Sequence, residues 1–208
     1  MLIITIKQGK ERSLIDGELH VYASAVDRVD GKPGERMQTG ATALLQTSSG
    51  KFLARAAFNP QSQVRARVWS FDPNEAIDHA FIKRRVSISV GRRTGAGGSD
   101  AAIPKSRTSL LPIRLCAGEQ DGLPGLLVDW HRAGPGYLIC RFLAAGVDAW
   151  KIPIVQSLMK ETGCNNVYEL SEPLMRRGEG LPDVSGALAG EAPPDHLLEP
   201  AGRPQKTR

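Results

Sequence analysis

The sequence has few of the features that mark secreted or disulfide-stabilised proteins. Its 208 residues include only three cysteines, and none of them forms a Cys-x-x-Cys pair. Cys116, Cys140 and Cys164 lie in or beside apolar runs, where free thiols usually pack as small hydrophobic groups. A disulfide framework is therefore not expected, and the pattern predicts a reduced, cytoplasmic chain.

A targeting signal and a membrane span are also missing from the pattern. Residues 1–6 are apolar but too few for a signal peptide, and no uninterrupted apolar run approaches the length of a membrane span. The four histidines are far apart and lack the spacing of zinc ligands. We therefore expect neither a membrane partner nor a metal site.

Aromatic residues are scarce throughout the chain, and acidic residues are outnumbered by basic ones in its first half. Aromatics make up 5% of all residues, although the 41% hydrophobic content is enough for a packed core. Residues 1–115 carry 18 Lys and Arg against 10 Asp and Glu, whereas residues 116–208 carry 9 against 12. A polyanion would therefore dock on the first half, unless this charge is only an ordinary solvated surface.

Two neighbouring segments carry the clearest strand pattern. Small and apolar side chains alternate with other residues in 51–58 and, after a turn, again in 64–71. Such segments are typical of a hairpin with one apolar face. The opposite face of its second strand carries Arg65, Arg67, Trp69 and Phe71.

The following segments predict a helix and then a break between domains. Asp72 can cap a helix and Pro73 suits its first position, so we expect a helix that runs to Arg85. Glycine-rich sequence at 91–109 predicts a linker, because glycine and small polar residues favour flexible chain. The predicted organisation is a first domain at 1–75, a helix start and linker at 76–109, an α+β domain at 110–194 and a loose tail at 195–208.

Several strings are similar to one known family. Residues 64–73, Val-Arg-Ala-Arg-Val-Trp-Ser-Phe-Asp-Pro, resemble the end of the PUA domain in the bacterial large-subunit ribosomal RNA cytosine-5 methyltransferase I family, and residues 52–60 resemble the strand before it. Residues 118–125, Gly-Glu-Gln-Asp-Gly-Leu-Pro-Gly, resemble the family's linking domain and form the most specific match. The resemblance covers most of residues 1–194, with departures at 18–22 and 87–109.

This resemblance implies both a fold and a function. The implied fold class is α+β, with an N-terminal PUA-like β-barrel, a small α+β linking domain and no Rossmann-like methyltransferase domain. The chain would be the RNA-binding front part of an S-adenosylmethionine-dependent methyltransferase, with ribosomal RNA as its partner. S-adenosylmethionine is implied for the full-length family, and a truncated or frameshifted gene copy would produce this pattern.

No catalytic or cofactor-binding residue is predicted within the chain itself. The string at 95–98, Gly-Ala-Gly-Gly, superficially resembles a dinucleotide loop, but no buried strand precedes it. The three thiols have no basic helper nearby in sequence and are expected to be structural. Glu119 and Asp121 lie in a glycine-flanked turn, where carboxylates usually accept hydrogen bonds from backbone amides.

The predicted RNA contacts lie on the hairpin and on the helix that follows it. Arg55, Arg65 and Arg67 can meet phosphates, and Trp69 can stack on a base or ribose. The basic surface continues at the helix end with Lys83, Arg84 and Arg85. The alternative is a solvated strand face with Trp69 buried at its edge.

Two further hypotheses stay open at this point. The chain could be a complete or partner-assisted RNA methyltransferase, in which case it would bind S-adenosylmethionine. It could also be a non-catalytic module that pairs with a second copy as a homodimer.

Overall fold

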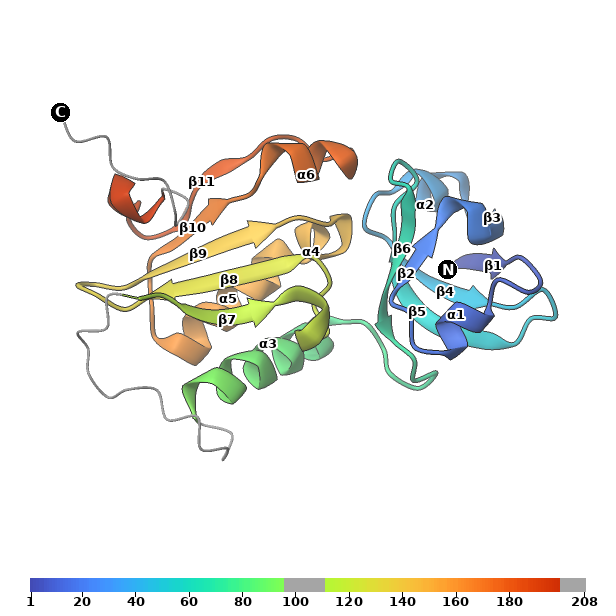
Figure 1. Cartoon of the computed structure of the whole chain (residues 1–208), viewed down its shortest axis with the longest axis horizontal. Helices are drawn as coiled ribbons and strands as arrows, with labels where there is room; N and C mark the ends of the chain where they lie inside the picture. The colour runs from blue at the N-terminus through green and yellow to red at the C-terminus, as the bar shows by residue number, and fades with distance from the viewer. Residues whose placement is uncertain (96–110, 199–208) are drawn as a thin grey trace.

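The computed structural model describes residues 1–95 and 111–198, and it contains two β-sheets that lie side by side along the long axis of the molecule (Figure 1). Most of the predicted glycine-rich linker, at 96–109, and most of the predicted tail, at 199–208, lie outside the described residues.

The first sheet is formed by the N-terminal third of the chain. Its six strands follow the order β2-β6-β5-β4-β1-β3, and every neighbouring pair is antiparallel except the parallel pair of β1 and β4. Its elements are β1 (Leu2–Ile6), α1 (Arg12–Ile15), β2 (His20–Tyr22), η1 (Ala23–Ala25), β3 (Val26–Asp30), α2 (Pro33–Met37), β4 (Thr42–Gln46), β5 (Phe52–Phe58) and β6 (Val64–Ser70).

The predicted hairpin is confirmed as β5 and β6. These strands pair antiparallel, with Ala57 opposite Arg67, and a register shift between Arg55 and Ala56 adds a bulge. Alternation along the pair sends Ala54, Ala56, Ala66 and Val68 into a core that also contains β1 and β4 side chains. The inward face of the hairpin therefore follows directly from the period of two in the sequence.

The second sheet has five strands in the order β11-β10-β9-β8-β7. β7, β8 and β9 form an antiparallel meander, β9 and β10 run parallel, and β11 returns antiparallel. Its elements are α3 (His79–Thr94), β7 (Ile113–Ala117), η2 (Gly118–Asp121), β8 (Leu126–His131), β9 (Tyr137–Phe142), α4 (Ala145–Ala149), α5 (Lys151–Thr162), β10 (Val167–Leu170), α6 (Pro173–Gly178), β11 (Ser185–Ala189) and η3 (Asp195–Leu197).

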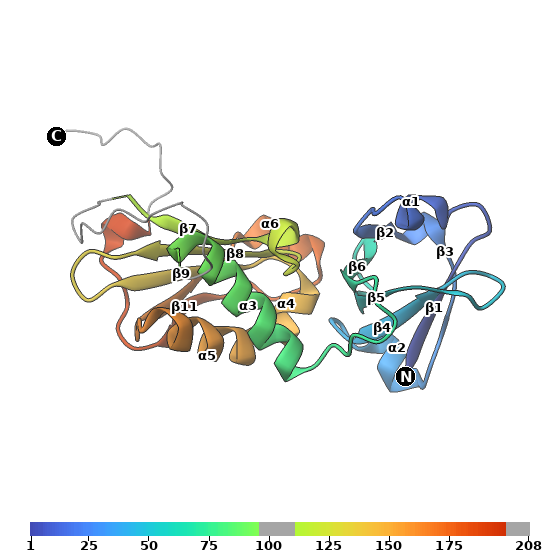
Figure 2. The same cartoon turned by 90° about the horizontal axis from the view of Figure 1, so that it is seen from below.

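One face of the second sheet is covered by two helices. α3 and α5 contact each other and lie alongside one another across that face (Figure 2). α4 and α5 form the crossover between the parallel strands β9 and β10, as parallel pairs require. The second sheet is therefore mixed and helix-covered on this face.

The helix predicted from Asp72 begins later and ends later than expected. Asp78 is the cap, because its carboxylate accepts a hydrogen bond from the Phe81 amide at 2.9 Å. Asp72 instead accepts from the Asn74 amide at 2.8 Å in the preceding turn. The helix continues to Thr94 and ends at Gly95, whose φ of 75° suits a helix C-terminus. Residues 91–94, predicted as linker, are therefore its last turn.

The two sheets share part of one hydrophobic core. Ala57 and Trp69 from the first sheet are buried in the same cluster as Phe81 from α3 and Val147 from α4. The Trp69 ring meets the Phe81 ring edge-on at a centroid distance of 6.0 Å. The part of the chain that forms the second sheet therefore also buries side chains of the first.

Gly146 allows α4 to approach the first sheet. A Cβ atom at this position would lie 2.5 Å from the Ala57 Cβ and 2.8 Å from the Trp69 Cζ2. We expect Gly146→Ala to lower the free energy of unfolding by about 1–3 kcal/mol, because the junction would be overpacked. Urea denaturation followed by circular dichroism measures this change.

Gly91→Ala is the matched control for that substitution. Gly91 lies within α3, and a Cβ there would meet nothing within 4 Å. Alanine should stabilise the helix by about 0.5–1 kcal/mol relative to glycine. Equal stability of the Gly146→Ala variant and the parent chain would show that the junction is not tightly packed.

Candidate nucleic-acid interface

A buried carboxylate joins the two sheets. Glu179, which is 5% exposed, accepts hydrogen bonds from Asn59 Nδ2 at 3.0 Å and from Ser62 Oγ at 2.9 Å. It also accepts from Arg67 Nη2 at 3.0 Å and from the Ala145 amide at 3.2 Å. These donors come from both sides of the junction, so the charge of Glu179 is compensated only when the sheets are docked.

Two of the predicted RNA-binding residues, Arg67 and Trp69, lie at this junction. The Arg67 guanidinium lies between Glu179, at 3.0 Å, and Glu119, at 3.7 Å. Trp69 is 4% exposed and packs against Phe81. Neither side chain is placed to contact a polyanion in this conformation, because the strand face that carries them is covered by the second sheet.

The other two predicted arginines of the hairpin, Arg55 and Arg65, donate hydrogen bonds to backbone carbonyl groups. Arg65 donates to the carbonyl oxygens of Asn59 and Pro60, and Arg55 donates to the carbonyl oxygen of Pro73 at 3.0 Å. Both arginines therefore hold turns that flank the strands.

The three predicted residues of the helix lie on α3 and are more accessible. Lys83 is exposed, and the side chains of Arg84 and Arg85 are 49% and 29% exposed. Both arginines pair with Glu75, at 2.5 Å and 3.2 Å. Burial tends to raise the pKa of Glu75, but hydrogen bonds from Ser70 and Arg84 and the nearby arginine charges lower it overall.

Two further cations of α3 were missed because residues 91–94 were predicted to be linker. Arg92 and Arg93 form its last turn, and Arg92 remains 60% exposed. The helix carries five cations and no carboxylate between His79 and Thr94. The spacing of four that links Arg84, Ile88 and Arg92 could have revealed this exposed stripe, since such positions share one helix face.

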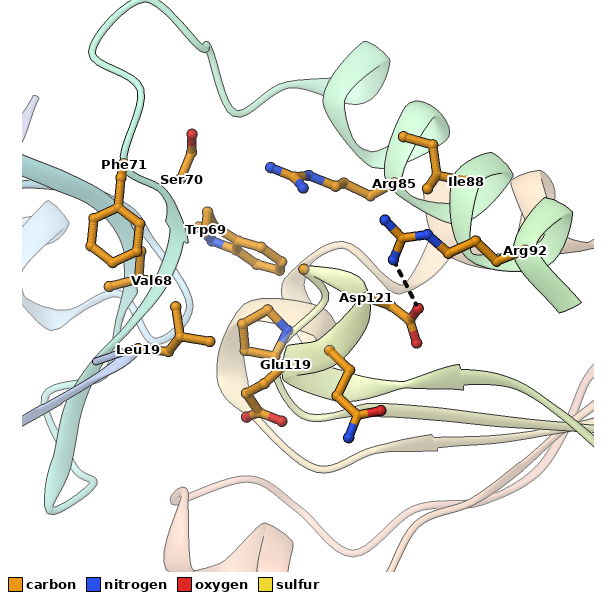
Figure 3. Close-up of a pocket in the computed structure, with 13 residues that line it drawn as sticks. Leu19, Val68, Trp69, Ser70, Phe71, Arg85, Ile88, Arg92, Glu119 and Asp121 are labelled. Carbon is orange, nitrogen blue, oxygen red and sulfur yellow. Dashed lines mark ion pairs between the residues drawn. The ribbon is translucent and has the colours of Figure 1, made fainter. Parts of the chain in front are cut away.

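A cleft of about 280 Å³ lies where α3 faces the first sheet (Figure 3). Arg85, Ile88 and Arg92 line it from the helix, and the turn after β7 lines it from below. The first sheet contributes Leu19, Val68, Trp69, Ser70 and Phe71. The cleft thus combines arginines with an apolar wall.

The two carboxylates of the cleft are already engaged. Asp121, with a side chain 1% exposed, accepts from the Ala117 amide at 2.7 Å and from Arg93 Nη1 at 2.8 Å. This confirms the predicted role of Asp121 in capping a backbone amide. Glu119 differs from that prediction, because it pairs with the side chains of His20, at 3.3 Å, and Arg67.

The glycines of the family string at 118–125 have identifiable packing roles. Gly122 has a φ of 67°, and a Cβ there would lie 3.0 Å from Arg85 Nη1. Gly125 has a φ of 83°, and its Cβ would lie 2.4 Å from the Ala144 Cβ. Glycine is therefore required both by backbone conformation and by close approach.

The three thiols are buried, as predicted. Burial, with a smaller effect from Asp121, raises the pKa of Cys116 to about 11. Burial also raises the pKa of Cys140 and of Cys164. Nucleophilic chemistry needs the thiolate, so these environments favour a packing role.

The described residues do not fit S-adenosylmethionine. That cofactor needs a free carboxylate for its ribose beside a glycine-rich turn that opens a helix. In the cleft both carboxylates are ion-paired, and the turn at Gly122 is covered by Arg85. At the strand ends, Glu169 is buried against Lys151 and Arg176. No step of methyl transfer is derived from these residues.

The described ranges contain neither a candidate metal cluster nor a candidate membrane-spanning helix. In residues 1–95 and 111–198, histidine, cysteine and carboxylate side chains do not gather in a group of three that could hold a metal ion. Within the same part of the chain, no helix combines the length and the apolar content that crossing a bilayer would require.

Similarity to known proteins covers nearly the whole chain. Residues 4–71 match the PUA-like domain family. Ribosomal RNA large subunit methyltransferase I of Aliivibrio fischeri is 36% identical over 195 residues, which are 94% of this chain and 46% of that protein. The same enzyme of Pseudoalteromonas translucida is 37% identical over 198 residues, with shares of 94% and 46%. The chain spans about half the length of these curated relatives.

Two solved structures share the fold. One is a Streptococcus mutans protein described as a SAM-dependent methyltransferase, and the other is described as a methyltransferase complexed with SAH. Each matches with a TM-score of 0.66 and 15% identity, over 93% of this chain and 44% of the other. The class that the fold and the domain define is therefore a protein with a PUA-like domain and a fold shared with structures described as methyltransferases.

Within that class, the chain is homologous to the large-subunit ribosomal RNA methyltransferase I family. The family resemblance predicted from residues 52–73 and 113–126 is thereby confirmed.

The predicted fold class is wrong. We expected a β-barrel, a small α+β linking domain and no Rossmann-like methyltransferase domain, but 93% of the chain matches structures described as methyltransferases. That share includes both the curved six-stranded sheet and the mixed five-stranded sheet. The prediction was wrong because it placed a domain boundary at residues 91–109. α3 instead extends to Thr94 and packs on the second sheet beside Trp69.

We expect Glu179→Ala to destabilise the chain by about 3–5 kcal/mol, because Arg67 would lose its closest carboxylate inside the junction. Glu161→Ala, which removes an exposed carboxylate at the end of α5, should change stability by less than about 0.5 kcal/mol. Chemical denaturation of both variants measures the difference. A similar small effect at both positions would mean that Glu179 does not hold the sheets together.

The thiols should react slowly with iodoacetamide in the folded protein near neutral pH and all react after denaturation, because the thiolate is the nucleophile. Cys116 ionises near its usual pKa of 9.0 when unfolded but at about 11 when folded. Its contribution to stability is therefore complete below pH 9 and is lost as the pH rises to 11. Mass spectrometry counts the modified thiols, and rapid labelling of the folded chain would contradict their burial.

Proposed function

We propose that this chain docks on large-subunit ribosomal RNA through the exposed face of α3 and the cleft beside it. The observation that carries the proposal is the basic stripe of α3, which joins Arg84, Ile88 and Arg92 and lies at the edge of the cleft. Positive charge along one helix face is the electrostatic footprint of a polyanion site. The homology to ribosomal RNA methyltransferases and the PUA-like domain support RNA as that polyanion.

The proposed surface keeps the predicted helix residues Lys83, Arg84 and Arg85, adds Arg92, and leaves out the residues of the β6 face. Residues of the β6 face serve the junction, whereas α3 presents Lys83, Arg84 and Arg92 to solvent. Arg84 and Arg92 lie eight residues apart, which is about 12 Å along the helix and enough to follow several atoms of a backbone. The rigid core beneath α3 fixes this spacing, since Phe81, Ile82, Val86 and Val90 are all buried.

We also propose that the docking serves a methyl-transfer reaction. S-adenosylmethionine is the cofactor that the family implies, and one neighbouring structure is described as complexed with SAH. The described residues of this chain would then supply recognition, because they do not form a site for that cofactor.

The double substitution Arg84→Ala and Arg92→Ala tests the surface directly. We expect affinity for a large-subunit ribosomal RNA fragment to fall at least about tenfold at low salt, because two phosphate contacts are lost. The slope of log affinity against log salt should become shallower by about 1–2. Fluorescence anisotropy over a salt series gives both quantities.

The matched control is Arg28→Ala with Arg177→Ala. It removes the same charge from β3 and α6, where each arginine forms an exposed pair with an aspartate. Its affinity should stay close to that of the parent chain. Equal losses in both double variants would show that net charge alone governs binding, and unchanged affinity in the α3 variant would remove α3 as the site.

A further inference from the structure

Phe71 occupies an unusual place beside the proposed RNA surface. It follows β6 directly and keeps 40% of its surface exposed. It lines the cleft next to α3 and also a second cavity of about 340 Å³ next to α1. Phe71 lines both cavities, so its side chain lies beside each of the two recesses.

Each of the two recesses is lined by at least one cation. Arg92 and Arg85 line the first one, and Lys51 lines the second. Between them the walls are apolar, with Ile88 on one side of Phe71 and Phe52 on the other. The groove formed by the two recesses, which we call the Phe71 groove, thus places an aromatic ring between positive charges.

The carboxylates of the Phe71 groove do not cancel this pattern. Asp121 is buried and paired with Arg93 at 2.8 Å, and Glu119 is paired with His20 and Arg67. Arg92 lies 3.8 Å from Asp121 but keeps 60% of its side chain exposed. A polyanion in the groove would therefore meet accessible cations and carboxylates that are already neutralised.

We propose that the Phe71 groove binds an unpaired stretch of RNA, with one base stacked on the Phe71 ring. This inference rests on the proposed docking of RNA and adds the form of RNA that is recognised. Aromatic side chains stack on bases that are splayed out of a helix, whereas an A-form duplex hides its base faces. An exposed ring in a recess between cations fits a single strand, whose phosphates track the positive charge while its base covers the ring.

The choice between single-stranded and double-stranded RNA can be tested with the full chain. Anisotropy titrations at low salt would compare a short single-stranded segment of large-subunit ribosomal RNA with the same segment annealed to its complement. The parent chain should bind the single strand about fivefold to a hundredfold more tightly, because only the single strand can stack a base on the ring. Equal affinities for the two forms would overturn the inference.

Phe71→Leu tests the stacking residue. Single-strand affinity should fall about fivefold to a hundredfold, duplex affinity should not change, and the salt slope should stay the same because no charge is removed. Phe71→Trp should keep or increase the affinity. Thermal unfolding should be nearly unchanged by the leucine variant, since much of the ring is exposed.

Tyr22→Leu is the matched control, because Tyr22 is an exposed aromatic on β2, 54% accessible, that lines neither recess. It should bind both RNA forms like the parent chain. Unchanged single-strand affinity in a folded Phe71→Leu variant would overturn the stacking role while leaving the α3 surface standing. Failure of the parent chain to bind either RNA at low salt would overturn the proposed docking itself.

Discussion

The arrangement of this molecule depends on the carboxylate of Glu179 at the junction of the two sheets. A buried charge costs several kcal/mol unless it is paired and hydrogen-bonded. Here Asn59, Ser62, Arg67 and the Ala145 amide provide that compensation together. The apolar part of the same junction, where Trp69 meets the Phe81 edge, adds burial. Separating the sheets would lose both contributions at once, so α3 and the first sheet keep a fixed relation.

That fixed relation decides which cations face solvent. The side chains of β6 that would form a basic face in an isolated hairpin are enclosed, and Arg67 becomes an internal ion pair. The same docking holds α3 with its buried stripe inward and Arg84 and Arg92 outward. α3 therefore presents Lys83, Arg84 and Arg92 to solvent, and the cleft with Phe71 lies directly beside this helix (Figure 3).

Local structure was predictable from the sequence where a short-range rule decides it. The alternation in 51–71 predicted β5 and β6, apolar context predicted three buried thiols, and the glycines of 118–125 predicted a turn. The start of α3 was not predictable in this way, because Asp72 and Asp78 are both able to cap, and packing of Phe81 and Val86 decides between them. The pairing of the strand face was not predictable either, since Arg67 donates to Glu179, which lies 112 residues away in sequence. Alternation tells which side chains share a face, but not what covers it.

We propose that RNA contacts α3 and the Phe71 groove rather than the β6 face. The most direct measurement is photo-crosslinking of the intact chain to ribosomal RNA that contains 4-thiouridine, with the crosslinked residues mapped by mass spectrometry. We expect crosslinks at Phe71 and in the exposed part of α3, between Lys83 and Arg92. Crosslinks confined to Arg65, Arg67 and Trp69 would contradict it, because Arg67 is paired with Glu179 and Trp69 is buried where the two sheets meet.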